Sequence, residues 1–203
     1  MGSVKQYHRR IRESGPMGVS VVILSQGEVL LRPWQVSDAQ WYVDARDEEV
    51  LRWTTEPPKL TVDETVAAIE AVNAREDVFS FAVVDLHRNE LAGNVAVVKS
   101  ASYANEAEVM YWLAKTSRGR GIAAKAVGLL CDWGFTELGL ERLTLKTYTD
   151  NVRSQGVAER VGFRQFRPAN ENGEKPQFVW YELTKQMRER GNSSGQSSSG
   201  EAG

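Results

Sequence analysis

The chain has 203 residues, of which 41% are hydrophobic and 26% charged, and its formal net charge is −2. This length and composition suit one globular domain with a sizeable core, and the near-neutral charge argues against a dedicated nucleic-acid-binding protein. The single cysteine, Cys131, excludes an internal disulfide and a cysteine zinc site, and we expect it in the core. With only two histidines, His8 and His87, we expect neither a Ser-His-Asp site nor a bound metal.

The two ends of the chain differ in composition from its middle. Residues 1–18 are polar and basic, which predicts a flexible arm in which either Met1 or Met17 is the natural start. Residues 191–203 are rich in Gly and Ser, which is typical of a disordered tail. A single domain is therefore predicted over residues 19–190. No apolar run approaches the ~20 residues of a membrane span, and none resembles a signal peptide, so we expect a cytoplasmic protein that binds no membrane.

The first half of the domain carries signals for a strand, three helices and a hairpin. Capping boxes mark two helix starts, at Ser37-Asp38-Ala39-Gln40 and Thr61-Val62-Asp63-Glu64, and Pro33 ends the strand before them. A polar turn at His87-Arg88-Asn89 separates two β-rich runs, which predicts the hairpin. In chain order, we expect a strand over 29–32, helices from 37, over 48–53 and from 61, and strands over 79–85 and 91–99.

The second half alternates strands and helices before a final hairpin. Asn151 is a good N-cap and Gly162 a natural C-cap for one of these helices. In chain order, we expect a strand over 106–114, a helix over 122–138, a strand over 141–148, a helix over 151–161, and strands over 163–167 and 177–183. The whole order predicts a mixed α/β fold, with a mixed sheet flanked by helices.

The segment Arg118-Gly119-Arg120-Gly121-Ile122-Ala123 lies between a predicted strand and the helix that follows it. Glycines at such a turn let the backbone approach a ligand closely, and the helix N-terminus offers unpaired N–H groups and a positive dipole end. This combination indicates a phosphate or pyrophosphate site. The alternative is a glycine-containing helix start with solvated arginines. The segment matches neither a Walker loop nor a dinucleotide fingerprint.

Further landmarks follow one another over roughly residues 27–185, namely Leu31-Arg32-Pro33 with Ser37-Asp38, Glu108-Val109-Met110-Tyr111-Trp112-Leu113, Asn151-Val152-Arg153-Ser154, and Val161-Gly162-Phe163. With the glycine turn, which fits Gln/Arg-x-x-Gly-x-Gly/Ala, they resemble the GNAT superfamily of acyl-CoA-dependent N-acetyltransferases. The resemblance is sharper for the RimJ/RimL branch, which acetylates protein N-termini and various small amines. It implies a mostly antiparallel sheet with a β-α-β-α unit that binds the cofactor. The chain departs from the branch at Met110 and Lys125, where Gly and Glu are common.

The resemblance implies acetyl-CoA as co-substrate and no metal. Coenzyme A would run along the strand from Tyr111 to Ala114, and its pantetheine arm would pair with backbone groups of Trp112, Leu113 and Ala114. The side chain of Arg118 would cap the turn, and Arg118 and Arg120 would add positive charge. Asn151 would bind the pantetheine as well as cap its helix. The pyrophosphate would lie on backbone N–H groups of Gly119, Arg120, Gly121, Ile122, Ala123 and Ala124.

Four side chains are candidates for the acid–base chemistry, two as base and two as acid. Glu108 is the favoured base, with Glu106 second, and the alternative is that Glu108 is an exposed strand carboxylate. By resemblance Ser154 is the acid near the sulfur, although a serine in the first turn of a helix commonly bonds the local backbone. Tyr148 is a further candidate acid, for which core packing is the alternative role. Trp53 lies in the region that lines the acceptor side in this family.

The resemblance leaves several functions open. The leading prediction is acetyl transfer to a primary amine, either a protein N-terminus or a small molecule, by direct attack in a ternary complex. An acidic run at Asp44, Asp47, Glu48, Glu49 and Glu56 could attract a cationic acceptor, or it could be a solvated helix face. The alternatives are a longer or acidic acyl donor such as succinyl-CoA, and a CoA-binding regulatory module without catalysis. A homodimer would be in keeping with the family.

Overall fold

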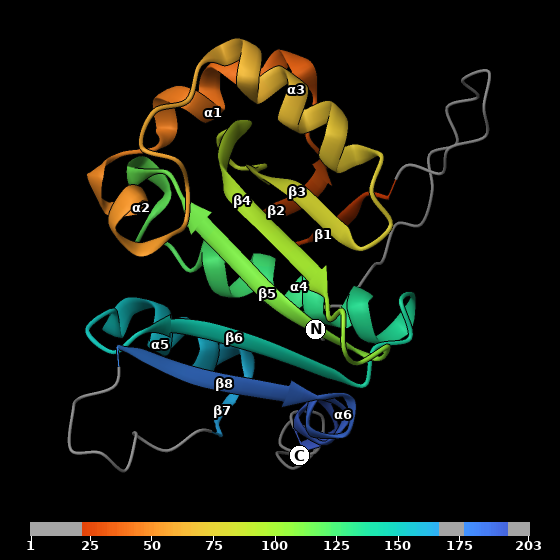
Figure 1. Cartoon of the computed structure of the whole chain (residues 1–203). Coiled ribbons are helices and arrows are strands. Elements are labelled where there is room, and N and C mark those ends of the chain that lie inside the picture. Colours follow the sequence, from red (N-terminus) through yellow and green to blue (C-terminus); the bar gives the residue numbers. More distant parts are fainter. Residues whose placement is uncertain (1–21, 167–176, 195–203) are drawn as a thin grey trace, which may run out of the picture.

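The computed structural model describes residues 22–166 and 177–194 and places eight strands in one sheet (Figure 1). The strands are β1 (Leu24–Gln26), β2 (Val29–Pro33), β3 (Val78–Asp85), β4 (Glu90–Lys99), β5 (Glu106–Leu113), β6 (Arg142–Tyr148), β7 (Arg164–Gln165) and β8 (Phe178–Thr184). Their spatial order is β1-β2-β3-β4-β5-β6-β8-β7, and only β5 and β6 pair in parallel. The predicted mixed, mostly antiparallel sheet is confirmed.

Helices cover both faces of this sheet. They are α1 (Ala39–Ala45), α2 (Glu48–Trp53), α3 (Val62–Asn73), α4 (Ile122–Thr136), α5 (Val152–Val161) and α6 (Lys185–Ser194), with short 3-10 turns η1 (Val36–Asp38) and η2 (Lys115–Ser117). α4 packs against β1, β2, β4 and β5 on one face, and α5 packs against α4 and β6. α1 and α3 pack against β4 and β3 on the opposite face (Figure 1).

Helix ends that depend on neighbouring residues form as predicted. Thr61 accepts a hydrogen bond from the Glu64 N–H (3.2 Å), and the Glu64 carboxylate accepts one from the Thr61 N–H (2.8 Å). Asn151 caps α5, and Gly162 ends it in the left-handed region at φ 101°. The predicted caps at Thr61, Asn151 and Gly162 are therefore confirmed.

The first helix begins differently from the predicted capping box at Ser37. The Asp38 carboxylate accepts hydrogen bonds from the backbone N–H of Gln35 (2.9 Å) and from the guanidinium of Arg32 (2.7 and 2.9 Å). Asp38 is thereby buried, and η1 precedes α1. That prediction was wrong because Arg32, six positions earlier on β2, draws Asp38 inward, and a capping-box pattern does not include a residue outside the helix start.

Two elements, β1 and α6, were not predicted. β1 forms a short hairpin with β2 at the edge of the sheet. α6 follows β8 directly and extends to Ser194, so the predicted domain boundary at residue 190 falls within this helix. The predicted arm over residues 1–18, residues 195–203 of the predicted tail, and residue 167 of the last predicted hairpin lie outside the described residues.

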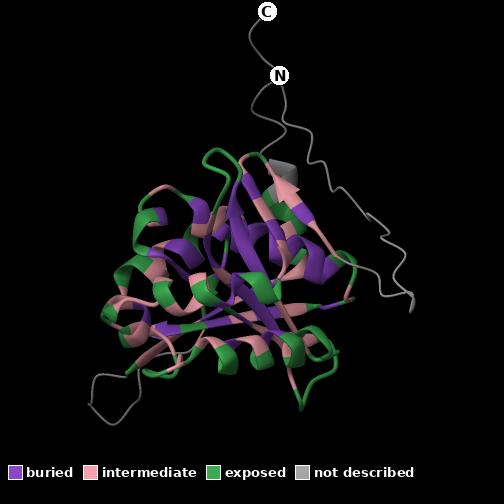
Figure 2. Cartoon of the chain, turned by 90° about the horizontal axis from the view of Figure 1, so that it is seen from above, coloured by how far each residue is buried: buried purple, intermediate pink, exposed green. Residues whose placement is uncertain are grey.

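The main core lies between the sheet and the pair α4 and α5, and Figure 2 shows buried residues concentrated there. Cys131, on α4, is fully buried in it, and burial raises the pKa of its thiol. The thiol therefore stays neutral, and its predicted place in the core is confirmed. A smaller cluster around Trp34 and Ile69 attaches α1 and α3 to the other face.

The strands β5 and β6 separate part-way along their length, and this separation positions the site. They pair only over Glu106–Glu108 and Arg142–Thr144. Beyond Glu108, β5 stays paired with β4 as far as Leu113, and β6 stays paired with β8 as far as Tyr148. The two facing strand edges beyond this point form what we call the β5–β6 slot (Figure 1).

Gly93, on β4, lies beside Leu113 at the end of β5, on the side of β5 away from the slot. A Cβ at this position would lie 2.2 Å from the carbonyl oxygen of Trp112 and 2.8 Å from the Cα of Leu113. We expect Gly93→Ala to lower the free energy of unfolding by about 3 kcal/mol, because backbone rather than a flexible side chain must move. Urea denaturation measures this loss. The control is Gly156→Ala, whose Cβ would approach Arg160 no closer than 3.6 Å. Equal stability of the two variants would contradict the prediction.

Candidate active site

The turn before α4 holds the two glycines in the left-handed region. Gly119 has φ 74° and Gly121, the N-cap residue of α4, has φ 77°. A Cβ at either position would meet nothing within 4 Å, so glycine is favoured there by backbone conformation rather than by space. No side chain caps α4. The N–H groups of its first turn, including those of Ile122, Ala123 and Ala124, are therefore available to an anion together with the positive end of the helix dipole.

The two arginines of the turn are bound to carboxylates. Arg118 contacts Asp47 at 2.7 Å and Glu49 at 2.8 Å, and its Nε donates to the Leu113 carbonyl at 3.0 Å. The hydrogen bond from Arg118 holds the pKa of Asp47 below its usual value, so Asp47 stays ionised. Arg120 forms an ion pair with the buried Asp85 at 2.6 Å. Because carboxylates balance the charge of both arginines, the turn would bind an anion mainly through its backbone N–H groups.

Lys125, one of the two departures from the RimJ/RimL pattern, is also compensated. It follows the first turn of α4 and forms an ion pair with Glu28, in the β1–β2 turn. The hydrogen bond from Lys125 holds the pKa of Glu28 below its usual value. The lysine therefore ties α4 to the β1–β2 hairpin rather than leaving an unbalanced charge beside the turn.

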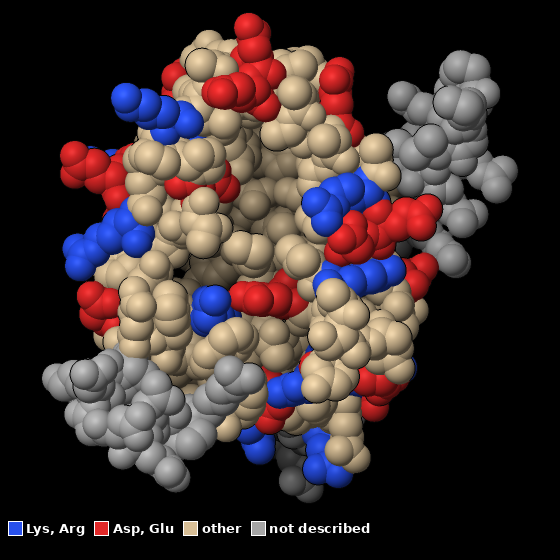
Figure 3. Space-filling view, viewed as in Figure 1, with Lys and Arg blue, Asp and Glu red and all other residues tan. Residues whose placement is uncertain are grey.

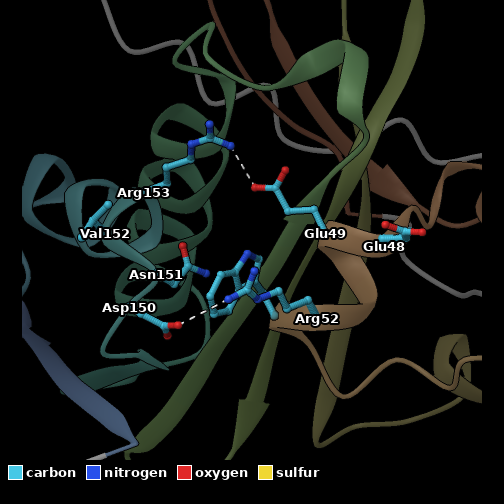
Figure 4. A pocket seen from close by; sticks show the side chains of 8 residues that line it. Glu48, Glu49, Arg52, Asp150, Asn151, Val152 and Arg153 are labelled. Carbon is cyan, nitrogen blue, oxygen red and sulfur yellow. Dashed lines mark hydrogen bonds and ion pairs between the residues drawn. The ribbon is translucent and has the colours of Figure 1, made fainter. Parts of the chain in front are cut away.

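Ion pairs cross from α2 to the start of α5 around a cavity of about 400 Å³. Arg153 contacts Glu49 at 2.9 Å, and Arg52 contacts Asp150 at 3.5 Å (Figure 4). Trp53 lines this cavity, and its ring lies 5.6 Å from that of Tyr148. The cavity is lined by Glu48, Glu49, Arg52, Trp53, Asp150, Asn151, Val152 and Arg153.

Strand alternation decides which backbone groups of β5 face the slot. The Ala114 N–H donates to the Ala92 carbonyl on β4 at 2.9 Å. In an antiparallel pair these directions alternate, so the backbone groups of Trp112 also point at β4. Those of Tyr111 and Leu113 point into the slot, and Arg118 takes the Leu113 carbonyl. Of the three residues predicted to pair with pantetheine, only Leu113 directs its backbone groups into the slot, and Tyr111, at the start of the predicted CoA strand, does so as well.

Ser154 lies in the first turn of α5 with a tyrosine partner that sequence reasoning missed. The Asn151 side chain accepts the Ser154 N–H at 3.1 Å, and the Tyr111 hydroxyl donates to Ser154 Oγ at 2.9 Å. Burial raises the pKa of Tyr111 to about 12, so its phenol remains a donor throughout the neutral range. Among the described residues Ser154 Oγ has no acceptor for its own proton. That proton is available to a ligand atom.

The two candidate bases on β5 have different surroundings. The Glu106 carboxylate is 3.0 Å from Arg142, which also contacts Glu182 at 2.8 Å. Glu108 has no ionic or hydrogen-bonding partner among the described residues, and it lies opposite Thr144 at the last paired position before the slot. Figure 3 shows this side of the molecule hollowed over the middle of the sheet. Of the two candidates, the structure therefore pairs Glu106 and leaves Glu108 without a partner among the described residues.

Tyr148, the further candidate acid, lies at the end of β6. Its ring packs against Trp53 and, at 4.6 Å between centroids, against Phe178 on β8. Its hydroxyl has no hydrogen-bond partner within the part of the chain that the structure describes. Tyr148 is thus placed as part of an aromatic wall, apart from the Tyr111–Ser154 pair.

Comparison with known families decides the assignment of the fold. Residues 28–164 match the acetyltransferase (GNAT) domain family. The chain belongs to the GNAT acetyltransferase family. A curated relative of this GNAT domain is YdaF of Bacillus subtilis (strain 168), named as a candidate ribosomal N-acetyltransferase and 32% identical over 104 residues. That match covers 49% of this chain and only 57% of YdaF.

Solved structures share the fold of this GNAT domain at low sequence identity. Mycobacterium smegmatis RimJ, in complex with CoA-disulfide, has a TM-score of 0.69 and 20% identity, covering 82% of this chain and 89% of its own. A Vibrio cholerae spermidine N-acetyltransferase, in complex with CoA and spermine, has a TM-score of 0.69 and 19% identity. This match covers 79% of this chain and 98% of the Vibrio chain. The GNAT-like fold predicted from the motifs is confirmed.

Residues 22–166 and 177–194 lack both a membrane-spanning helix and a cluster of metal-ligating side chains. No helix there is long and apolar enough to cross a membrane. No group of three or more His, Cys, Asp or Glu side chains is arranged to hold a metal ion. The GNAT domain presents instead a glycine turn, a slot between strands, and polar side chains on both sides of that slot.

Proposed function

We propose that the chain is an N-acetyltransferase that moves an acetyl group from acetyl-CoA to a primary amine, by direct attack in a ternary complex. The observation that carries this proposal is the β5–β6 slot. It has on one side the carboxylate of Glu108, which has no partner among the described residues, and on the other the hydrogen-bonded pair of Tyr111 and Ser154. Acyl transfer from a thioester to an amine removes a proton from the amine and delivers one to the departing thiolate, so a proton acceptor and a proton donor beside one slot suit this reaction.

On the acceptor side, Glu108 takes a proton from the attacking amine, directly or through one water. The new N–C bond forms on the carbonyl carbon of the thioester, and the C–S bond then breaks. The N–H groups of Tyr111 and Leu113 face the slot and can stabilise the oxyanion of the tetrahedral intermediate. The acetylated amine leaves, and Glu108 returns its proton to solvent.

On the leaving-group side, Ser154 gives its free proton to the departing CoA thiolate. The hydrogen bond from Tyr111 orients the serine hydroxyl so that its own proton points away from the phenol, and it supports the negative charge that develops on Oγ. Ser154 then regains a proton from solvent. We class Ser154 as the acid and Tyr111 as a residue that positions it.

The cofactor half of the proposal rests on the glycine turn. A pyrophosphate would lie on the N–H groups from Gly119 to Ala124, and the pantetheine arm would enter the slot beside Leu113 and the cap residue Asn151. Two solved structures with this fold are complexes with CoA compounds, which supports coenzyme A as the cofactor. A cytoplasmic location and a homodimer remain predictions.

The glycine turn gives a test of cofactor binding. Gly121→Ala places an L side chain at φ 77°, which costs about 1 kcal/mol in folding, and a shifted turn should weaken CoA binding severalfold. The matched control is Gly139→Ala, at φ 66° with equally open space, at the far end of α4. We expect the two variants to lose similar stability in thermal unfolding, and only Gly121→Ala to lose CoA affinity in calorimetry. Equal CoA affinity in both would remove the turn from the binding site.

The activity itself is tested by thiol release from acetyl-CoA with a panel of amino acids, polyamines, aminoglycosides and N-terminal peptides. Release that depends on one class of acceptor, with a matching acetylated product by mass spectrometry, is the expected result. Thiol release only with succinyl-CoA or a longer acyl-CoA would show that acetyl-CoA is not the acyl donor. Tight CoA binding with no release from any donor would overturn the proposal in favour of a regulatory CoA-binding module.

A further inference from the structure

The side of the sheet that carries Glu108 continues across the slot onto β6 and β8. Register and alternation place Glu108 and Met110 of β5, Lys146 of β6 and Trp180 of β8 on this same face, which we call the open face. Lys146 lies two positions beyond Thr144, the partner of Glu108, and therefore about 7 Å further along β6.

Lys146 is a cation without a compensating carboxylate among the described residues. Its side chain is exposed, and its ammonium lies 4.9 Å from the ring centroid of Phe178 and 5.2 Å from that of Trp180. Neither contact neutralises its charge. Nearby arginines do have carboxylate partners. Arg142 contacts Glu106 and Glu182, and Arg52 contacts Asp150.

The acidic run that could attract a cationic acceptor is largely occupied. Asp47 and Glu49 bind Arg118, and Glu49 also binds Arg153. Glu56 accepts a hydrogen bond from Tyr42 at 2.7 Å. Beside the slot, the Glu108 carboxylate and the Lys146 ammonium have no ionic partner among the described residues. This pattern of charge is complementary to a molecule that carries both an amine and an anion.

We propose that Lys146 binds an anionic group of the acceptor, so that the site takes a primary amine that carries a carboxylate or a comparable anion. This inference rests on the proposed function. The amine of the acceptor would contact the Glu108 carboxylate. Its anionic group would pair with the Lys146 ammonium, which lies over the rings of Phe178 and Trp180. Free amino acids have this chemistry, and so do peptides with an acidic residue near their N-terminus.

The test compares acceptors that differ only in that charge, at saturating acetyl-CoA. One arm pairs free amino acids with their amides, a second pairs N-terminal peptides bearing Asp with the same peptides bearing Asn, and spermidine is the cationic reference. We expect the wild type to favour the charged member of at least one arm by about tenfold in kcat/KM, the usual size for a hydrogen bond to a charged group. The arm that shows the preference identifies the source of the anion.

The variants are Lys146→Gln and the control Lys99→Gln. Lys99 also lies over an aromatic ring, that of Phe79 at 5.3 Å, but its place on β4 puts it on the opposite face of the sheet. Lys146→Gln should lose the preference through a raised acceptor KM, with kcat and the acetyl-CoA KM retained, whereas Lys99→Gln should behave as the wild type. Thermal unfolding checks that both variants are folded.

Several outcomes would overturn the inference. A wild type that prefers amides or spermidine would do so, as would a charge preference that survives in Lys146→Gln. Selective loss of succinyl-CoA use in Lys146→Gln would move the anion from the acceptor to the donor. Absence of turnover with every donor and acceptor would instead remove the proposed function, and this inference with it.

Discussion

Glu108→Gln should lower kcat by about 10² to 10⁴, the usual contribution of a general base, while CoA affinity is retained. The side chain lies where β5 and β6 separate, and the structure gives its carboxylate no partner among the described residues. Glutamine keeps the size of the side chain but cannot accept the amine proton. Stopped-time product assays and calorimetric CoA binding measure the two quantities.

Glu106→Gln is the matched control, because it lies on the same strand and the same face. Its carboxylate already binds Arg142, so this change should reduce stability slightly and activity by much less than Glu108→Gln. If Glu106→Gln were the more damaging substitution for kcat, the base would be Glu106. If neither changed kcat, the amine would be deprotonated by solvent before it binds.

Ser154→Ala should lower kcat by about 10², the lower end for general acid catalysis, and Tyr111→Phe by about tenfold. Because Tyr111 acts through Ser154 at 2.9 Å, we expect the double variant to be no slower than Ser154→Ala alone. Independent roles would make the two losses multiply. A larger loss in Tyr148→Phe than in Ser154→Ala would transfer the role of acid to Tyr148.

The burial of Tyr111 should be measurable in how the free energy of unfolding depends on pH. Burial raises the pKa of Tyr111 from 10.0 in the unfolded chain to about 12 in the folded one. The unfolded chain therefore releases the phenolic proton first, and the stabilisation present below pH 10 is lost as the pH rises towards 12. Tyr111→Phe should unfold with a shallower pH dependence than the wild type above pH 10. Identical slopes would indicate that the phenol is solvated.

Features fixed by neighbours in the chain could be predicted from the sequence. The capping box at Thr61, the cap at Asn151 and the left-handed glycines at 121 and 162 depend on residues within one turn. The fold class followed from the order of such local elements and from the motifs. The free cysteine could be placed in the core because its helix face is apolar.

Features fixed by distant partners could not be predicted. Ser154 meets Tyr111 across 43 positions of sequence. Arg118, which we predicted at the phosphate site, also contacts Asp47, 71 positions away, and no local pattern indicates that contact. The direction of the backbone of Trp112 depends on the register with β4, which strand propensity does not specify.

The buried Cys131 makes the molecule convenient to study. It is the sole thiol of the sequence, it has no exposed surface, and burial keeps it in the unreactive protonated form. Colorimetric thiol reagents should therefore report released coenzyme A with little background from folded protein. A cysteine introduced on α2 or in the turn before α4 would be a unique attachment point for a fluorophore, without removal of the native one.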